Sequence, residues 1–348
     1  MDQEDVIINL RGLNSITAND DLTQVIFGGG IINDEFIQFA YDNGLEVCEY
    51  RLPNETDYQL TRSVNGGCDC VGVLGSALGG GVSRWMNRYG LPADNIVSVT
   101  VATANGSLIE VSEDNNTDLL WAIRGAGANF GIVTSATMNA YPTLNNGRFW
   151  SGELIFSGDK LERYIDAVNN LNLTEDMTIH WGFSHLESGR PVINAEVFWM
   201  SGDAEAGRRA FQPLYDLEPD DDTTQVVAYS HLNDDTAGFC EDGGRKPGWH
   251  VGLQTLDYPT FQAVWDNYVE FVNATGATYT GVLVECYSNY IVRDIGSAGA
   301  SYPHRDINFY AMTIPIYDDP ALDKAAEAYG NTVRDLWRAS SGFEQSRA

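Results

Sequence analysis

The sequence predicts an α+β protein of two domains, and three observations carry this prediction. The chain has 348 residues, too many for one average domain and enough for two. Short apolar runs separated by glycine fill the first part of the chain, whereas longer helical and alternating segments fill the rest. The composition shifts near residues 142–147. We therefore expect one domain over residues 1–143 and a second, with an antiparallel sheet flanked by helices, over residues 144–348.

Several strands and one helix are expected at the start of the first domain. The apolar side chains of Phe36, Phe39 and Ala40 recur at helical spacing, which predicts a helix over residues 32–44. Short apolar runs predict strands at residues 6–10, 23–27 and 46–50.

The rest of the first domain continues this β-rich pattern. The dipeptide Asn105-Gly106 is a strong hairpin signal between two apolar runs, at residues 96–103 and 108–111. A helix is expected over residues 114–121, and a strand over residues 132–140.

The second domain has longer elements that predict an antiparallel sheet covered by helices. Asp203 has the character of an N-cap, and Ser188-Gly189 reads as a turn between two strands. Helices are expected over residues 161–171, 203–214, 258–273 and 321–339. Strands are expected over residues 177–184, 192–200, 279–287 and 308–316.

The charge balance excludes two classes of partner. The chain has 20 Lys and Arg against 49 Asp and Glu, a net charge of −29. Nucleic-acid binding needs a basic surface, and an anionic membrane would repel an acidic one, so neither is expected as a partner. No run approaches the ~18 apolar residues of a membrane span. The acidity itself favours solubility and says nothing about fold.

A glycine-rich segment over residues 66–81 is the most informative stretch. So many glycines are costly unless the backbone must take positive φ or approach another group closely. A diphosphate is one such group, because unobstructed backbone N–H groups can surround its oxygens. The segment is neither a Walker loop nor a Rossmann fingerprint, since the residues that each requires are absent. By itself it leaves cofactor binding and a structural turn both open.

Further blocks follow at residues 90–95, 103–106 and 118–134. Together with the glycine segment they resemble the PCMH-type FAD-binding domain of the vanillyl-alcohol-oxidase superfamily, in its berberine-bridge-enzyme-like branch. The spacing of the blocks over residues 66–141 is specific, and a weaker likeness extends over the whole chain. The resemblance implies an FAD-binding domain followed by a substrate-binding domain.

The resemblance also implies which residues bind FAD. The first glycine segment would surround the flavin and the diphosphate, and the second, near residue 127, would line the cofactor. The implied set is Cys68, Val71, Gly72, Gly75, Ser76, Gly79, Gly80, Gly81, Asp94, Asn95, Gly127, Asn129, Gly131 and Ile132.

Cys68 stands where bicovalent members of this family carry the cysteine that bonds the flavin ring. The resemblance therefore implies covalent attachment of FAD through Cys68. Two alternatives stay open: Cys68 and Cys70 are inert small side chains, or the pair binds metal. No second Cys/His pair lies at ligand spacing, so no metal site is expected. The five cysteines are an odd number, so at least one lacks an intramolecular partner.

The resemblance implies oxidation of a small molecule such as an alcohol, a sugar or a secondary metabolite. Hydride would pass to the flavin, a protein base would take a proton, and O2 would reoxidise the flavin. Thr313 occupies the position of the family's catalytic glutamate, and threonine cannot serve as a base. Tyr287 and Glu285 are the candidate substitutes, with ordinary strand residues as the alternative. Trp181, Phe183, Phe198 and Tyr287 could form an aromatic wall, or simply pack in the core.

Against the family pattern the chain is expected to lack a segment at each end. The family's histidine-bearing glycine loop would precede Met1, and its return segment would follow Ala348. The alternatives to an active oxidase are an inactive remnant that does not retain FAD and a carbohydrate-binding protein without redox chemistry. The residues after Met1 show no signal peptide, whereas five Asn-x-Ser/Thr sequons favour a secreted parent, at Asn54, Asn105, Asn115, Asn172 and Asn273.

Overall fold

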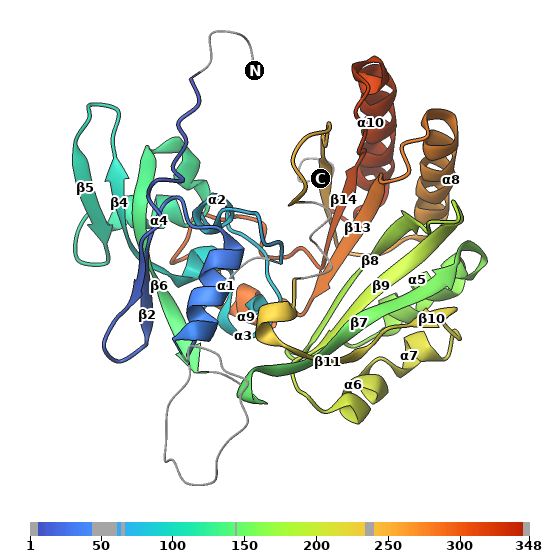
Figure 1. The fold of residues 1–348 in the computed structure, drawn as a ribbon, viewed down its shortest axis with the longest axis horizontal. Coiled ribbons are helices and arrows are strands. Elements are labelled where there is room, and N and C mark those ends of the chain that lie inside the picture. Colours follow the sequence, from blue (N-terminus) through green and yellow to red (C-terminus); the bar gives the residue numbers. More distant parts are fainter. Residues whose placement is uncertain (1–5, 44–60, 64–66, 143–144, 234–239, 344–348) are drawn as a thin grey trace. The chain divides into compact units, whose positions relative to one another are not determined.

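The computed structural model describes residues 6–43, 61–63, 67–142, 145–233 and 240–343 (Figure 1). The strand expected at residues 46–50 lies outside these ranges. The chain divides into two compact units. The first unit comprises residues 1–148, 228–241 and 290–305, and the second comprises residues 149–227, 242–289 and 306–348.

The first boundary between the units lies within a few residues of the expected one. The expectation of two continuous domains is nevertheless incomplete, because two later segments, residues 228–241 and 290–305, belong to the first unit. Composition shifts along a chain cannot reveal such returns, because long-range contacts determine them.

The first unit is built on a six-stranded sheet with β6 at its centre. The antiparallel hairpin expected around Asn105-Gly106 is confirmed, and Gly106 takes the positive φ of 82° that its turn requires. The sheet order is β1 (Ile16–Ala18), β2 (Gln24–Gly28), β6 (Ile132–Pro142), β4 (Ile96–Ala102) and β5 (Leu108–Ser112), with β3 (Thr61–Ser63) also pairing with β6.

Four helices of the first unit come from its N-terminal part. The helix expected over residues 32–44 is α1 (Asn33–Asp42), and the one expected over residues 114–121 is α4 (Thr117–Ala126). The glycine-rich stretch adds two short helices, α2 (Val73–Ala77) and α3 (Met86–Tyr89).

One expected strand of the first unit is wrong. Residues 6–10 are not a strand, and none of the described strands pairs with them. Val6 is 85% exposed and Ile7 72% exposed, so this apolar run is not buried against a sheet. A strand needs a neighbour to satisfy its backbone groups, and apolar character alone does not supply one.

The returning segment 290–305 is tied into the first unit by a buried ion pair. Arg305 donates two hydrogen bonds to the Asp94 carboxylate, at 3.0 and 2.6 Å, and both side chains are less than a tenth exposed. Its helix α9 (Tyr290–Ile295) packs against α3. Breaking one partner of a buried pair costs about 3–5 kcal/mol, so this contact holds the segment firmly.

The second unit is an antiparallel sheet whose central strands were expected from the sequence. The pairs β8–β9, β8–β13 and β13–β14 are confirmed at the expected positions. The order is β10 (Asp221–Asp222), β7 (Arg148–Ser157), β9 (Pro191–Trp199), β8 (Met177–His185), β13 (Gly281–Tyr287), β14 (Phe309–Ile314) and β12 (Trp249–Leu253), and β11 (Gln225–Ala228) pairs with β7.

Helices cover one face of this sheet, as Figure 1 shows. They are α5 (Leu161–Asn170), α8 (Tyr258–Thr275) and α10 (Asp323–Ser340). Trp181 of β8 and Trp337 of α10 are fully buried between the two layers. Helix α6 (Ala204–Ala210) begins as expected, because the Asp203 side chain accepts a hydrogen bond from the Ala206 N–H at 3.0 Å.

Strands β7 and β12 were not expected from the sequence. In β7 the alternation is broken by Gly152, which has φ 151° and lies against the backbone of Thr223 and Thr224. In β12 a Cβ at Gly252 would meet Ile307. Close approach to another segment thus explains a glycine inside each strand.

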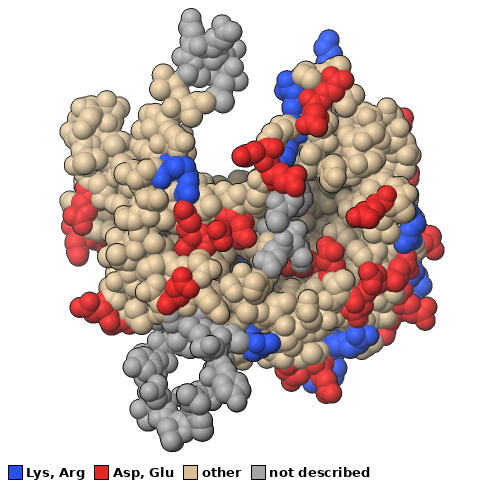
Figure 2. Space-filling model, in the orientation of Figure 1, with Lys and Arg blue, Asp and Glu red and all other residues tan. Residues whose placement is uncertain are grey.

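The surface carries the acidity that the composition indicates. On the face drawn in Figure 2, Asp and Glu side chains are more frequent than Lys and Arg. Within the part of the chain that the structure describes, no helix combines the length and apolar character that crossing a membrane requires.

Candidate functional site

Part of the glycine-rich loop is explained by the protein's own packing. Gly80 and Gly81 have φ values of 105° and 76°, which other residues rarely adopt. A Cβ at Gly80 would meet the ring of Tyr302, and one at Gly81 would lie 2.8 Å from Pro92. These two glycines would be required even without a ligand.

Three other glycines of the loop have no such internal reason. No described atom lies within 4 Å of a Cβ built at Gly75, and the nearest atoms at Gly72 and Gly79 are 4.0 and 3.7 Å away. None of the three has a positive φ. A Cβ at Gly75 would thus face open space, and one at Gly72 or Gly79 would meet only ordinary van der Waals contacts. This fits a cofactor that approaches the chain closely there.

The second glycine loop is attached to the first. The Gly127 N–H donates to the Leu78 carbonyl at 3.0 Å, and a Cβ at Gly127 would overlap the Leu78 side chain. Gly131, with φ 145°, lies against the Ala102 carbonyl, and Ile132 begins β6. The structure thus brings together two glycine loops that lie about 50 residues apart in the sequence.

Two expected cofactor residues form contacts with the protein. Asp94 binds Arg305 and also accepts the Leu91 N–H at 3.0 Å. Asn95 donates to the carbonyls of Tyr89 and Leu91, and its Oδ1 accepts the Tyr141 hydroxyl. Both side chains therefore hold the fold around the loop.

Three further members of the expected set lie beside the open glycines or in the second loop. Ser76 donates to the Val73 carbonyl at 3.0 Å, and Asn129 donates to the Ala126 carbonyl at 3.0 Å. Val71 is 40% exposed. A cofactor role for these residues, and for Asp94 and Asn95, stays a prediction.

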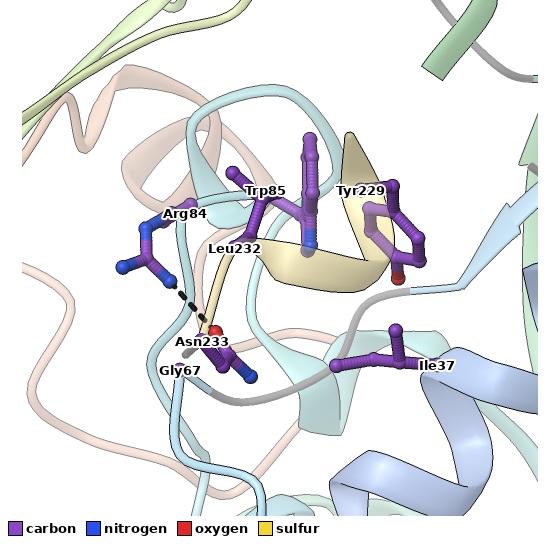
Figure 3. Close-up of a pocket in the computed structure, with 7 residues that line it drawn as sticks. All are labelled: Ile37, Gly67, Arg84, Trp85, Tyr229, Leu232 and Asn233. Atoms are coloured by element: carbon purple, nitrogen blue, oxygen red, sulfur yellow. Dashed lines mark hydrogen bonds between the residues drawn. The ribbon is translucent and has the colours of Figure 1, made fainter. Parts of the chain in front are cut away.

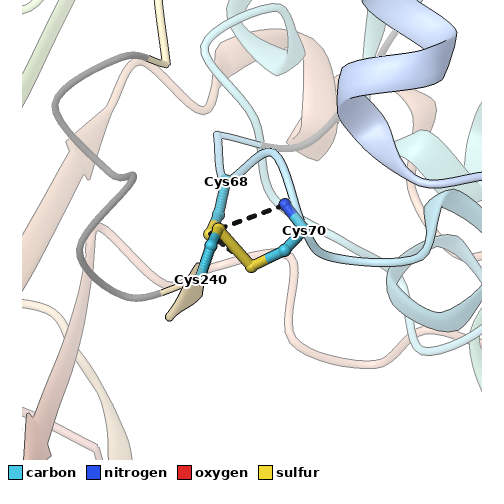
Figure 4. A group of neighbouring side chains, drawn as sticks. All are labelled: Cys68, Cys70 and Cys240. Atoms are coloured by element: carbon cyan, nitrogen blue, oxygen red, sulfur yellow. Dashed lines mark hydrogen bonds between the residues drawn. A yellow bond between two sulfur atoms is a disulfide. The ribbon is translucent and has the colours of Figure 1, made fainter. Parts of the chain in front are cut away.

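Cys68 lies in a cluster of three cysteines that the sequence did not indicate (Figure 4). Cys70 and Cys240 form a disulfide across 170 residues, and Cys68 Sγ lies 3.7 Å from Cys240 Sγ. The third sulfur of the cluster, that of Cys240, comes from a segment that is distant in the sequence. Sequence spacing alone therefore did not indicate three sulfurs that could hold a metal ion. While the disulfide stands, Cys68 provides the one thiol of the cluster.

A pocket lies where the returning segment 228–241 meets the glycine region (Figure 3). Arg84, only 4% exposed, donates to Asn233 Oδ1 at 3.0 Å, and Asn233 donates to Asp69 at 3.0 Å. Trp85 and Tyr229 pack with ring centroids 5.7 Å apart. These contacts, together with the disulfide, fix the segment beside residues 67–70.

The face of the second unit's sheet opposite the helices carries a connected polar network. Tyr287 Oη lies 3.0 Å from His180 Nε2 and 3.2 Å from Glu285 Oε2. His180 Nδ1 lies 3.0 Å from Glu196 Oε2. Side chains of β8, β9 and β13 thus form a continuous path from Glu196 through His180 and Tyr287 to Glu285.

The hydrogen bonds of this network form one connected path. The Tyr287 hydroxyl donates to Glu285, and the two ring nitrogens of His180 contact Glu196 and Tyr287 Oη. His250 shares this face, and burial lowers its pKa while the Glu285 carboxylate opposes that shift. The arrangement can receive a proton at Tyr287 and pass one to Glu285.

Sequence reasoning gave Tyr287 and Glu285 as candidates, and their catalytic role stays a prediction; it did not include His180 and Glu196, which contact them in the structure. Strand alternation would have placed His180 on this face, because its neighbours Ile179 and Trp181 face the helices. Of the four residues for which the sequence left an aromatic wall and core packing both open, Trp181 and Phe183 pack in the helix-covered core. Thr313 also turns to the helices, where its hydroxyl lies 2.9 Å from Tyr329 Oη.

The chain is similar in sequence to curated flavoproteins. It is 29% identical to the FAD-linked oxidoreductase hasG of Aspergillus fumigatus over 97% of its own length and 71% of that protein. It is 31% identical to the FAD-linked oxidoreductase tazG of Aspergillus terreus, over 80% of its own length and 59% of that protein. No family profile matches the chain.

Solved structures show the same architecture. The xylooligosaccharide oxidase of Myceliophthora thermophila C1 has a TM-score of 0.78 at 20% identity, covering 96% of this chain and 70% of that one. The berberine-bridge-enzyme-like protein 1 of Physcomitrella patens also has a TM-score of 0.78, at 16% identity, over 95% of this chain and 70% of that one. The fold is thus α+β and berberine-bridge-enzyme-like. In sequence, the chain is similar to FAD-linked oxidoreductases.

Proposed function

We propose that this protein oxidises a small organic substrate, namely an alcohol, a sugar or a secondary metabolite, with FAD as cofactor and O2 as electron acceptor. One observation carries the cofactor part of the proposal: nothing described in the chain requires glycine at positions 72, 75 and 79. None of Gly72, Gly75 and Gly79 has a positive φ, and a Cβ at any of them would meet no described atom closer than 3.7 Å. The names of the relatives and of the carbohydrate oxidases among the solved structures support the redox class.

FAD would be held by the two glycine loops, with Gly72, Gly75 and Gly79 next to its diphosphate and flavin. When bound, FAD accepts a hydride from a substrate carbon and returns the electrons to O2. The protein's own contribution is to orient the substrate and to handle its proton.

Tyr287 is the proposed proton acceptor. Its hydroxyl lies between His180 and Glu285, so it can take a substrate O–H proton at Oη while passing its own proton to Glu285. Glu196 supports this step by binding the far side of the His180 ring, which fixes the orientation of that ring. Glu285 thus stores the proton, and His180 and Glu196 are positioning residues.

Cys68 is the proposed site of covalent attachment. It is half-buried and carries a free thiol next to the open glycines. A bond from its sulfur to the flavin would secure the cofactor, and in Cys68→Ser the flavin would remain bound without a covalent link.

The test is the visible spectrum of the purified chain, recorded before and after acid precipitation, followed by an assay for H2O2 with a panel of sugars and alcohols. Flavin bands at about 370 and 450 nm are expected. Yellow colour that remains in the acid pellet of the wild type but not of Cys68→Ser supports attachment through Cys68.

Three outcomes separate the parts of this proposal. A folded but colourless protein contradicts FAD binding and favours an inactive remnant. A yellow protein whose colour leaves the acid pellet in both forms contradicts the covalent link alone. A yellow protein that is reduced by substrate without producing H2O2 contradicts O2 as the acceptor.

A further inference from the structure

Three cysteines of the first unit, Cys68, Cys70 and Cys240, have their sulfur atoms close together (Figure 4). Cys68 Sγ is 3.7 Å from Cys240 Sγ and 3.8 Å from Cys70 Sγ, so it lies against both sulfurs of the Cys70–Cys240 disulfide. The other described free cysteine, Cys286, is buried in the core of the second unit. A free thiol in van der Waals contact with a disulfide is the arrangement that thiol–disulfide exchange requires.

The surroundings keep the three sulfurs together whichever bond is formed. The Cys68 carbonyl accepts the Val71 N–H at 3.3 Å and the Asn33 side-chain amide at 2.7 Å, which fixes the backbone of the turn. The Cys70 backbone N–H also donates to Cys240 Sγ at 3.3 Å, so Cys240 has a contact with the turn besides its disulfide. The three sulfurs all lie within 4.8 Å of one another, which keeps them within reach during an exchange.

We propose that Cys68, Cys70 and Cys240 form a thiol–disulfide exchange site. The Cys68 thiolate attacks Cys240 Sγ, so that a Cys68–Cys240 bond forms and the Cys70–Cys240 bond breaks. The electron pair leaves on Cys70 Sγ, which then takes up the proton that Cys68 lost to water. One disulfide replaces another, so no external oxidant or reductant is needed.

Solvent exposure determines the direction of attack. Cys70 is exposed, whereas Cys240 and Cys68 are half-buried. A thiolate that leaves on Cys70 is solvated by water, whereas one that leaves on Cys240 is less so. Exchange therefore joins Cys68 to Cys240 in preference to closing the short Cys68–Cys70 loop.

The exchange has a consequence for the cofactor, and this consequence rests on the proposed function. If Cys68 is the residue that bonds flavin, it is available only in the form with the Cys70–Cys240 disulfide. In the exchanged form its sulfur is occupied. The disulfide in place would thus determine whether a chain can attach its flavin covalently.

The experiment maps the free thiols of the purified full chain without reductant. A small amount of maleimide is added over a time course at pH 6, 7 and 8, the reaction is quenched in acid, and the peptides are identified by mass spectrometry. We expect label to accumulate on Cys70, together with a Cys68–Cys240 disulfide peptide, because the exposed thiol is trapped fastest. This rate should rise with pH, since the thiolate is the form that attacks a disulfide.

Two variants provide matched controls. Cys70→Ser is expected to form the Cys68–Cys240 bond, and Cys68→Ser is expected to keep Cys70 unlabelled at every pH. Label on Cys68 but never on Cys70 in the wild-type chain would overturn the proposal. So would a folded Cys70→Ser variant that contains no Cys68–Cys240 disulfide under oxidising conditions.

The amount of acid-stable flavin is measured separately from the pairing of the cysteines. If covalent attachment depends on the exchange, Cys70→Ser should hold several-fold less acid-stable flavin than Cys240→Ser. If disulfide exchange is observed in a chain that binds no flavin, the result would support the proposed exchange site and contradict the proposed function. Equal acid-stable flavin in the two variants, with exchange observed, would contradict the coupling alone.

Discussion

The glycine loop of the first unit and the polar face of the second unit's sheet differ in what they present. At Gly72, Gly75 and Gly79 the loop presents backbone without side chains. The sheet face presents side chains that touch one another, with Tyr287 between His180 and Glu285. One region is thus suited to close approach of a ligand, and the other to proton transfer.

This difference explains why the glycine loop can be predicted from the sequence more readily than the polar face can. A loop that recognises a ligand through its backbone is continuous and leaves a local run of glycines. A proton path assembled from β8, β9 and β13 has members more than 100 residues apart, and only strand pairing brings them together. Backbone recognition is therefore local in sequence, whereas side-chain chemistry depends on sheet register.

The largest expected effect tests the polar face. Tyr287→Phe removes the proposed proton acceptor, and kcat should fall about 10²- to 10⁴-fold, the usual contribution of a positioned acid or base. The flavin spectrum should not change. The matched control is Tyr310→Phe, which removes another hydroxyl from the same face, with its ring centroid 6.1 Å from that of Tyr287. An equal loss in both variants would contradict a specific role for Tyr287.

The next effect tests the loop. Gly75→Val adds a side chain where the proposed cofactor approaches, and overpacking of about 1–3 kcal/mol corresponds to roughly 5- to 150-fold weaker flavin binding. The control is Gly281→Val, because a Cβ at Gly281 also meets nothing within 4 Å and its φ is not positive. Flavin titration followed by absorbance checks both. If Gly75→Val binds flavin as tightly as wild type, the open backbone is not the cofactor site.

The smallest effect concerns stability in the second unit. Burial lowers the pKa of His185 from its ordinary 6.5, and Nδ1 of the ring is hydrogen-bonded with the Tyr268 hydroxyl. Below pH 6.5 the unfolded chain therefore binds a proton at this histidine more readily than the folded one. The contribution of His185 to stability is present above pH 6.5 and is lost as the pH falls through the lower folded pKa.

Thermal unfolding of wild type and His185→Gln between pH 7.5 and 5.5 measures this contribution. The wild type should lose stability on acidification more steeply than the variant. His250, whose pKa is also lowered by burial, remains in both proteins, so a residual slope is expected in His185→Gln. Identical slopes would show that His185 does not contribute.

Several elements of the fold were predictable because local rules decide them. The β4–β5 hairpin follows from Asn105-Gly106, and the start of α6 follows from the Asp203 side chain. Strands β7 and β12 were missed because Gly152 and Gly252 interrupt their patterns, and each of these glycines is explained by a neighbour distant in sequence. The apolar run at residues 6–10 was predicted as a strand but does not form one, since it lacks a partner strand among the described residues.

The sequence by itself determined the α+β class, the glycine loops and the resemblance to FAD-linked oxidoreductases, because periodicity, turn residues and glycine runs are local properties. Only the tertiary structure decided that Cys240 reaches Cys70, that Arg305 binds Asp94 and that His180 and Glu196 join Tyr287. These contacts join residues that lie between 16 and 211 positions apart. Their positions depend on which later segments of the chain pack into the first unit and on the register of the strands. Both arise from burial of the whole core and not from any single segment.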